Sequence, residues 1–517
     1  MKKKFNVTAV CVPERHYMVD ISERIALIRG MVEEGDYFAI NRGRQYGKTT
    51  TLYMVSRELK DDYTVLFLSF ESADDLFQSN AAFAEGFLQM VSRALKRSKV
   101  DLQILQEWGA AISEETPFVE LSERITALCE TVDKPIVLLI DEVDKSSDNQ
   151  IFLTFLGLLR EKYIERDILG EATFQSVILA GVYDIRNLRL KIRPDSEHKK
   201  NSPWNIAADF DTRMSFDAEQ IAGMLSDYED DHHTGMDVKA MAAEIYDYTG
   251  GYPYLVSKIC KLIDESGWEW NQEGINDAVK KLLDEKSPLF DSLMNRMIEY
   301  PDVEKLVYQA LFSGDKLPYS SINTTLDLAK MFGFIRVENG QVFIANKIFE
   351  TILYNYFVTT EQAMETGAYQ AGAIEQNRFI HDGTLDMDLV VERFTEIFHD
   401  IYGDQPERFA EEEGRKMFLL FLKPIINGTG NYYIEAQTRD RTKTDVIVDY
   451  LGKRYIIEMK IWRGDSYNQR GEEQLFGYLD YFHEDKGWLV SFCFNKDKKI
   501  GVSRIRYKDK EIVEAIV

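Results

Sequence analysis

Short apolar runs alternate with longer helical segments in the first third of the chain, and this alternation restricts the possible folds more than any other feature. The expected strands are DYFAIN, YTVLFLSFE, PIVLLIDEVD and SVILAGVYD, at 36–41, 63–71, 135–144 and 176–184. They are short and rich in β-branched residues, as strands are. The pattern predicts a mostly parallel sheet covered by helices, in an α/β chain of several domains.

The loop after the first expected strand carries a candidate phosphate-binding motif, RGRQYGKTT, followed by an expected helix at 48–60. In the pattern G-x-x-x-x-G-K-[ST], main-chain N–H groups surround the phosphates, the lysine reaches the terminal ones and the hydroxyl binds magnesium. The end of the motif fits, but Arg42 stands where the first glycine is expected, beside Gly43. We therefore expect ATP to contact Arg44, Gln45, Tyr46, Gly47, Lys48, Thr49 and Thr50.

Two acids follow the third expected strand, at the end where parallel α/β sheets bind their ligands. Asp141 is expected to hold Mg²⁺ together with Thr49, and Glu142 to orient or deprotonate the attacking water. The alternative is that this acidic pair only caps the next helix. Its combination with the upstream strand, loop and helix favours the nucleotide site.

These residues resemble the AAA-like ATPases of the P-loop class that have an extra strand and a catalytic glutamate. The form R-x-R-Q-Y-G-K-T-T, with IDEVD and TGGYPYLVSKIC, is similar to the AAA-ATPase-like family of bacterial proteins, in which arginine is usual at the position of Arg42. The resemblance implies that Pro253 rests on the nucleotide; the other interpretation is a helix with proline in its first turn. It also implies a polar γ-phosphate sensor near Tyr183, Asp184 and Arg186.

A basic run, RNLRLKIRPDSEHKK at 186–200, interrupts this acidic region. Such runs are usually solvated loops. Two other interpretations stay open: an arm for nucleic acid, and a source of an arginine finger for a neighbouring subunit in a homo-oligomer.

The middle of the chain is expected to be helical. We assign residues 1–216 to the ATPase domain, 217–292 to a helical lid, 293–358 to a winged helix, 359–388 to a partly helical linker and 389–517 to a C-terminal domain. Asn339-Gly340 between two alternating runs predicts a type I′ hairpin, the wing. The candidate recognition helix carries Lys330 against Asp327, which favours packing over duplex reading.

The C-terminal domain contains two expected strands, TDVIVDY and KRYIIEMKIW, joined by a turn at Leu451-Gly452. Side chains repeat every two residues in a strand, so Glu458 and Lys460 share a face, and a hairpin can bring Asp445 beside Glu458. Hard oxygen ligands favour magnesium or manganese over zinc. Asp445 and Glu458 would bind the metal and Lys460 would steady a water.

The spacing D-x(12)-E-x-K resembles the PD-(D/E)XK nuclease superfamily. The glutamine that holds the metal site together in that family is matched by Gln474, which precedes Tyr478 by one helical turn. Nearby basic residues would neutralise a phosphate backbone locally.

The net charge of −25 repels nucleic acid, so a nucleic-acid partner needs a local patch. From residue 431 onward, basic and acidic residues are nearly balanced. No apolar run approaches the about 20 residues of a membrane span. Four widely separated cysteines fit a reducing cytosol, so we expect a cytoplasmic protein.

The leading hypothesis is an ATPase coupled to a Mg²⁺-dependent nuclease that acts on DNA or RNA. The first alternative is a regulatory ATPase whose C-terminal domain only binds nucleic acid or a protein partner. The second is a transcription regulator that uses the winged helix.

Overall fold

The structure is a computed structural model in which two compact units can be described. The first unit is residues 1–242 and 251–270, and the second is residues 243–250 and 271–517. The described residues are 3–71, 73–98, 100, 108, 112–143, 150–182, 206–208, 210, 212–312, 317–359, 366–381, 383–402, 411–426, 430–434, 446–462, 465–494 and 500–517. None of the described helices combines the length and the apolar composition needed to cross a bilayer.

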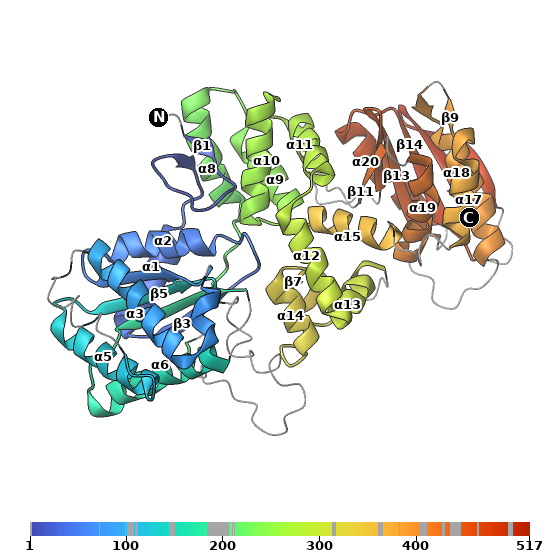
Figure 1. Cartoon of the computed structure of the whole chain (residues 1–517). Helices are drawn as coiled ribbons and strands as arrows, with labels where there is room; N and C mark the ends of the chain where they lie inside the picture. The colour runs from blue at the N-terminus through green and yellow to red at the C-terminus, as the bar shows by residue number, and fades with distance from the viewer. Residues whose placement is uncertain are drawn as a thin grey trace. The chain divides into compact units, whose positions relative to one another are not determined.

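The core of the first unit is a four-stranded parallel sheet (Figure 1). Its strands, in the spatial order β3-β6-β5-β4, are β3 (Tyr37–Asn41), β6 (Ser176–Gly181), β5 (Ile136–Asp141) and β4 (Thr64–Ser69). Every residue of β5 and β6 is buried, as in a sheet covered on both faces. The sequence prediction of a parallel α/β sheet is confirmed. β5 ends at Asp141 and β6 at Gly181, so both strands are shorter than the sequence runs predicted for them.

Helices cover both faces of this sheet. Figure 1 shows α2 on one side and α5 and α6 on the other. The helix α2 contacts three strands because Thr51, Leu52, Val55 and Leu59 repeat along one face. The helices of this region are α1 (Ser22–Glu34), α2 (Lys48–Leu59), α3 (Asn80–Arg97), α5 (Pro117–Thr131) and α6 (Gln150–Leu169).

A helical part follows within the first unit. It packs on the two short parallel strands β1 (Lys4–Phe5) and β2 (His16–Tyr17). Its helices are α8 (Ala218–His232), the first residues of α9 (Val238–Thr249), and α10 (Pro253–Ser266). The predicted lid, residues 217–292, is therefore divided between the two units.

The second unit begins with helices that lead into a short hairpin. The hairpin β7 (Ile335–Glu338) and β8 (Gln341–Ile344) turns at Asn339 and Gly340, which both have positive φ, so the predicted type I′ turn is confirmed. The helices here are α11 (Gln272–Asp284), α12 (Pro288–Glu299), α13 (Pro301–Phe312), α14 (Thr324–Phe332) and α15 (Lys347–Thr359).

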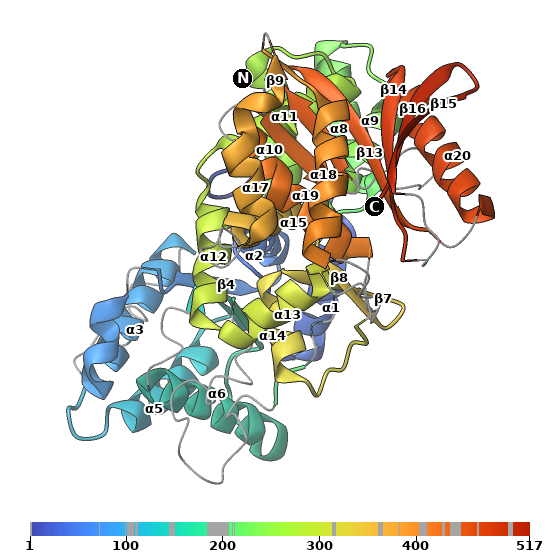
Figure 2. The same ribbon diagram turned by 90° about the vertical axis from the view of Figure 1, so that its right-hand side faces the viewer.

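A six-stranded mixed sheet forms the rest of the second unit. Its spatial order is β11-β12-β13-β14-β16-β15, with β13, β14 and β16 parallel. Figure 2 shows α18 and α19 on one side of it and α20 on the other. The strands are β11 (Gly430–Ile434), β12 (Val446–Tyr450), β13 (Lys453–Ile461), β14 (Lys486–Phe492), β15 (Gly501–Tyr507) and β16 (Lys510–Ile516). The helices are α18 (Met387–Tyr402), α19 (Glu411–Ile426) and α20 (Asp465–Tyr481).

The described residues of the segment predicted as a linker, 359–388, are packed in this unit. It contains α17 (Gly367–Glu375), which lies against α19. Gly372 is buried there, and a Cβ at this position would lie 2.1 Å from the carbonyl oxygen of Phe421. The polar, small-residue composition that suggested a linker instead permits close approach of two helices.

Candidate functional site

The loop between β3 and α2 bends back through two left-handed residues. Gln45 has φ 55° and Gly47 has φ 80°. Gly47 is the N-cap of α2, so the loop leads directly into the N-terminus of that helix. A helix N-terminus attracts anions, because its N–H groups are unpaired and the helix dipole is positive there.

Lys48 lies inside this loop and is 7% exposed. Its ammonium group donates hydrogen bonds to the carbonyl oxygens of Arg42 and Gly43, both at 2.9 Å. The curve of the loop therefore surrounds the positive charge that the sequence pattern assigns to the terminal phosphates.

Arg42 replaces the expected glycine without distorting the loop. Its main-chain N–H donates to the carbonyl of Gly181 and so continues the β3–β6 pairing by one residue. Its guanidinium points to the chain ahead of α8 and donates to the carbonyl of Thr212 at 2.9 Å. Arg42 has no positive φ, so this loop does not need glycine at that position.

Thr49 and Asp141 lie together, as the sequence predicts. The Thr49 hydroxyl donates to Asp141 Oδ2 at 2.6 Å, and Asp141 is 3% exposed. The other carboxylate oxygen accepts the main-chain N–H of Glu142 at 3.0 Å, and Glu142 itself has φ 59°. A hydroxyl and a carboxylate oxygen are hard ligands, so this pair fits Mg²⁺, which takes few protein ligands beside water and phosphate.

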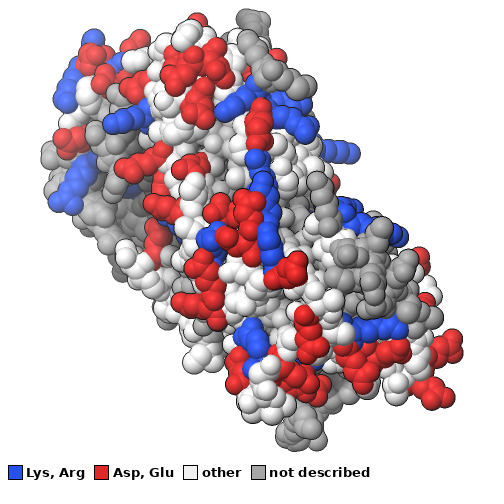
Figure 3. All heavy atoms as spheres, turned by 90° about the vertical axis from the view of Figure 1, so that its left-hand side faces the viewer, with Lys and Arg blue, Asp and Glu red and all other residues white. Residues whose placement is uncertain are grey.

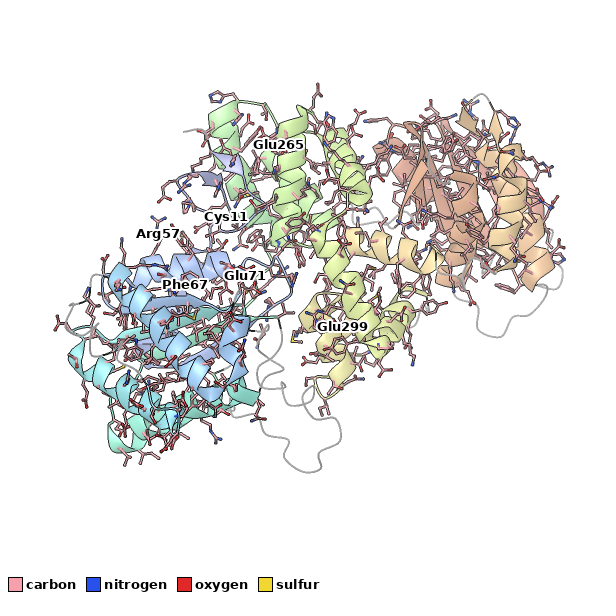
Figure 4. All side chains as sticks on the ribbon, viewed as in Figure 1. Cys11, Arg57, Phe67, Glu71, Glu265 and Glu299 are labelled. Carbon is pink, nitrogen blue, oxygen red and sulfur yellow. The ribbon has the colours of Figure 1, made fainter. Side chains whose placement is uncertain are left out.

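Thr50 faces elsewhere, although it is next to Thr49 in sequence. Its hydroxyl accepts the main-chain N–H of Cys11 at 3.1 Å. Glu14 and Arg57 add an ion pair at 2.7 Å between the N-terminal segment and α2. Figure 4 labels Cys11 and Arg57 beside this helix. Of the two neighbouring threonines, Thr49 is thus the one directed at the acidic residues.

Tyr252 contacts the phosphate-binding loop, which the sequence did not indicate. Its hydroxyl donates to the carbonyl of Arg44, and its ring packs edge-on against Tyr46 with centroids 4.4 Å apart. Pro253 is buried in the first turn of α10, directly after Tyr252 as N-cap. The signal that could have identified Tyr252 is its place in the Gly-Gly-Tyr-Pro turn already assigned to the site.

A buried arginine adds positive charge near the loop. Arg24 on α1 donates to the carbonyl of Met214 at 3.1 Å and approaches the Thr51 hydroxyl on α2. Burial, reinforced by the charge of Arg42, lowers the pKa of Arg24 to about 10, so it remains charged at neutral pH. Burial also raises the pKa of Tyr46, which stays neutral. The field at this end of α2 favours an anion.

The remaining predictions for the first unit fall outside the described residues. These are the sensor residues Tyr183, Asp184 and Arg186 and the basic run at 186–200.

Two of the candidate nuclease residues, Glu458 and Lys460, lie on β13, in the β12–β13 hairpin of the second unit. Leu451 and Gly452 both have positive φ and form its predicted two-residue turn. Glu458 is 0% exposed, and the ammonium of Lys460 lies 3.0 Å from its carboxylate. The two side chains therefore share a face, as strand alternation predicts. Asp445 is outside the described residues.

The helix α20 covers that same face. Gln474 donates from Nε2 to the hydroxyl of Tyr478 at 2.8 Å, which confirms that the two lie one turn apart on one side of the helix. Leu475 and Tyr478 pack with Leu489 of β14 in the core below α20. A Cβ at Gly471 would lie 3.6 Å from the side chain of Lys460, so the first half of α20 passes beside that lysine.

The described part of the chain contains no cluster of several metal-binding side chains. Within it, no group of three or more His, Cys, Asp and Glu side chains is placed to hold a metal ion. A magnesium site here would thus depend on one or two carboxylates with other oxygen ligands.

Comparison with known proteins identifies one family. A family model described as an AAA-like domain matches residues 14–358. No curated protein matches the chain.

Several solved structures are similar at low sequence identity. The Walker-type ATPase PABY2304 of Pyrococcus abyssi has a TM-score of 0.45 and 16% identity, over 68% of this chain and 99% of that chain. The ORC2 protein of Aeropyrum pernix, in ADPNP-ADP complexes, has a TM-score of 0.38 and 11% identity, over 68% and 97%. The ORC1 protein of Aeropyrum pernix, in complex with DNA, has a TM-score of 0.31 and 12% identity, over 65% and 93%. At these TM-scores the similarities carry no argument about activity.

Proposed function

Because the chain belongs to the AAA-like domain family over residues 14–358, we propose that it is a magnesium-dependent ATPase whose phosphate-binding loop is residues 42–50. The observation that carries the proposal is the 2.6 Å contact between the hydroxyl of Thr49 and the carboxylate of Asp141. This contact joins the loop after β3 to the end of β5, and the two residues are 92 positions apart in the sequence. Lys48, held inside the same loop, supports it.

Each residue has a separate role in this proposal. Lys48 and the N–H groups at the start of α2 bind the terminal phosphates. Thr49 and Asp141 hold Mg²⁺, which neutralises phosphate charge when bound. Glu142 accepts a proton from the attacking water, while Arg44, Gln45, Tyr46 and Pro253 line the nucleotide. Thr50 is not among these residues, because its hydroxyl is bound to the main-chain N–H of Cys11.

The ATPase proposal is tested with Glu142→Gln, which keeps the shape of the side chain and removes its basicity. We expect ATP hydrolysis to fall by about 100-fold or more, the usual effect of losing a general base. Binding of ATP should remain, because Lys48 and Thr49 are unchanged. Glu123→Gln is the control, since Glu123 is exposed on α5.

Two results would contradict the ATPase proposal. One is a purified protein that hydrolyses no ATP with Mg²⁺ present. The other is a Glu142→Gln variant that hydrolyses ATP as fast as the Glu123→Gln control.

For the C-terminal domain of the second unit, residues 389–517, we propose a PD-(D/E)XK-type nuclease that acts on DNA or RNA. The support is a buried carboxylate, Glu458, beside Lys460 on a central strand, with Gln474 on the helix over that face. Burying an ionised carboxylate costs free energy unless the carboxylate is paired with a positive charge or binds a metal. In the proposal Asp445 and Glu458 bind Mg²⁺, Lys460 steadies the attacking water and Gln474 supports the site.

The nuclease test removes both charges of the buried pair, Glu458→Ala with Lys460→Ala. Changing both avoids an uncompensated buried charge, which would destabilise the fold. Single-stranded DNA, duplex DNA and RNA are offered with Mg²⁺, with ATP and with a non-hydrolysable analogue. We expect the double variant to lose cleavage.

The control for this test is Asp302→Ala with Lys305→Ala, an exposed ion pair in the same unit. Thermal unfolding of both variants checks that the fold persists. Cleavage that survives in the Glu458 and Lys460 double variant would overturn the nuclease proposal.

A regulatory ATPase remains the second candidate, and one observation favours it. Lys460 is already engaged by Glu458, as it would be in a structural ion pair. Figure 3 shows acidic side chains spread over the face that it draws, with basic side chains between them, in keeping with the net charge of −25. This candidate predicts ATP hydrolysis that Glu142→Gln abolishes, without cleavage of any nucleic acid.

A transcription regulator is less favoured by the described contacts. Lys330 of α14 lies over the ring of Tyr319, 5.1 Å from its centroid, and the hydroxyl of Tyr319 reaches Asp327. Its charge is thus engaged within the helix–hairpin region. A salt-sensitive duplex shift that disappears in Lys330→Ala would favour this function instead.

A further inference from the structure

Tyr252 connects the start of α10 to the phosphate-binding loop. The residue is 2% exposed, and its hydroxyl donates to the main-chain carbonyl of Arg44, 208 residues away in sequence. Its ring packs edge-on against Tyr46, two residues further along the loop. Tyr252 therefore contacts the loop through both its polar and its apolar atoms.

The main chain at Tyr252 is fixed by its neighbours. Gly251 has φ 73°, and its carbonyl accepts the N–H of Phe216 at 2.8 Å. A Cβ at Gly251 would lie 1.8 Å from the carbonyl oxygen of Phe216. Pro253 follows and fixes its own φ. The hydroxyl of Tyr252 is thus presented to the loop from a turn with little freedom to move.

The hydrogen bond to Arg44 also orients the next amide. In a trans peptide the C=O and the N–H lie on opposite sides, so fixing the Arg44 carbonyl fixes the direction of the Gln45 N–H. Gln45 is left-handed, a conformation that a residue with a side chain rarely adopts. A bond that holds this peptide plane keeps an N–H group of the loop in one direction.

We propose that Tyr252 is a positioning residue for the nucleotide, which holds the Arg44–Gln45 peptide so that the loop is preorganised for phosphate. The inference rests on the proposed ATPase function. It adds a role for the tyrosine that precedes Pro253, with the hydroxyl as the acting group.

The variant Tyr252→Phe tests the inference, because it removes the hydroxyl and keeps the ring. We expect the Kd for a fluorescent ATP analogue to rise about three- to tenfold, the range for one lost hydrogen bond. The KM for ATP should rise similarly while kcat stays within about twofold, because Glu142, Thr49 and Asp141 are untouched.

Tyr37→Phe is the matched control. Tyr37 is buried on β3, and its hydroxyl also donates to a main-chain carbonyl, that of Phe174 at 3.1 Å. It lies at the start of the strand whose other end enters the loop. A general effect of losing a buried tyrosine hydroxyl would therefore appear in both variants.

Hydrogen–deuterium exchange without nucleotide gives a second readout. The amides of residues 43–48 should exchange faster in Tyr252→Phe than in Tyr37→Phe, because the peptide plane is released. A structural role confined to packing of α10 would leave these amides unchanged.

The outcomes separate the two proposals. If the wild-type protein binds no ATP, the proposed function fails and this inference fails with it. If the wild-type protein binds ATP but Tyr252→Phe matches Tyr37→Phe in affinity and in exchange, the ATPase proposal stands and the role of Tyr252 is overturned.

Discussion

Lys48 carries a buried charge whose hydrogen bonds go to two loop carbonyls. Phosphate oxygens would be stronger acceptors, because both partners of the bond would then be charged. Lys48→Met keeps the aliphatic stem and removes the ammonium group. We expect ATP affinity, measured by titration calorimetry, to fall by about 100-fold, equivalent to two charge-assisted hydrogen bonds.

Lys60→Met is the control for Lys48, since Lys60 is exposed at the other end of α2. It should bind ATP as the wild type does. Undiminished ATP binding by Lys48→Met would remove the lysine from the site.

Glu375 of α17 illustrates a charge whose effect depends on pH. The hydrogen bonds from the Arg393 guanidinium on α18 hold the pKa of Glu375 below its usual value. A depressed folded-state pKa stabilises the fold above the unfolded pKa of about 4.3, and the stabilisation is lost as pH falls through the folded value. Urea unfolding at pH 7 should show Glu375→Gln less stable by about 1 kcal/mol.

The difference between Glu375→Gln and the wild type should shrink steadily as the pH falls below about 5. Glu392→Gln, an exposed acid on α18, serves as the control. A difference that stays constant down to pH 3 would show that the charge of Glu375 is not responsible.

At the scale of elements, close packing of α17 on α19 depends on one glycine. A Cβ at Gly372 would lie 2.1 Å from the Phe421 carbonyl and 2.9 Å from Pro424, and main chain cannot move aside as a side chain can. Gly372→Ala should therefore lower the free energy of unfolding of the second unit by about 2 kcal/mol or more. Chemical denaturation monitored by circular dichroism measures this.

Gly477 on α20 provides the matched comparison, since a Cβ there would meet nothing within 4 Å. Gly477→Ala should leave the stability unchanged or raise it by up to about 1 kcal/mol, because alanine favours a helix more than glycine does. Equal effects of the two substitutions would show that α17 does not pack tightly on α19.

At the scale of the whole molecule, the chain forms two compact units, and each unit is built from two separate stretches of sequence. Two units predict two unfolding transitions instead of one. ATP with Mg²⁺ should raise the transition temperature of the first unit. At an ATP concentration 100 times the Kd, the free energy of unfolding of that unit should rise by about 2.7 kcal/mol. Differential scanning calorimetry measures both transitions.

Lys48→Met is the control for this shift and should reduce it to about 0.4 kcal/mol at the same ATP concentration, while both transitions remain. A nucleotide that raised only the transition of the second unit would place its site outside the loop at 42–50.

The sequence by itself determined the parallel strands, the phosphate-binding loop and the two-residue turns at Asn339-Gly340 and Leu451-Gly452. Each depends on residues that are close in the chain: apolar periodicity defines a strand, and left-handed turn positions favour glycine or asparagine, as at Asn339, Gly340 and Gly452. Glu458 and Lys460 share a face for the same local reason.

Only the tertiary structure decided which distant residues complete these features. It directs Arg42 to the Thr212 carbonyl and Tyr252 to the Arg44 carbonyl, and it packs the expected linker helix against α19. Periodicity records which face of an element is apolar but not which element will cover that face. The partner is selected when the folded chain brings together groups separated by up to two hundred residues.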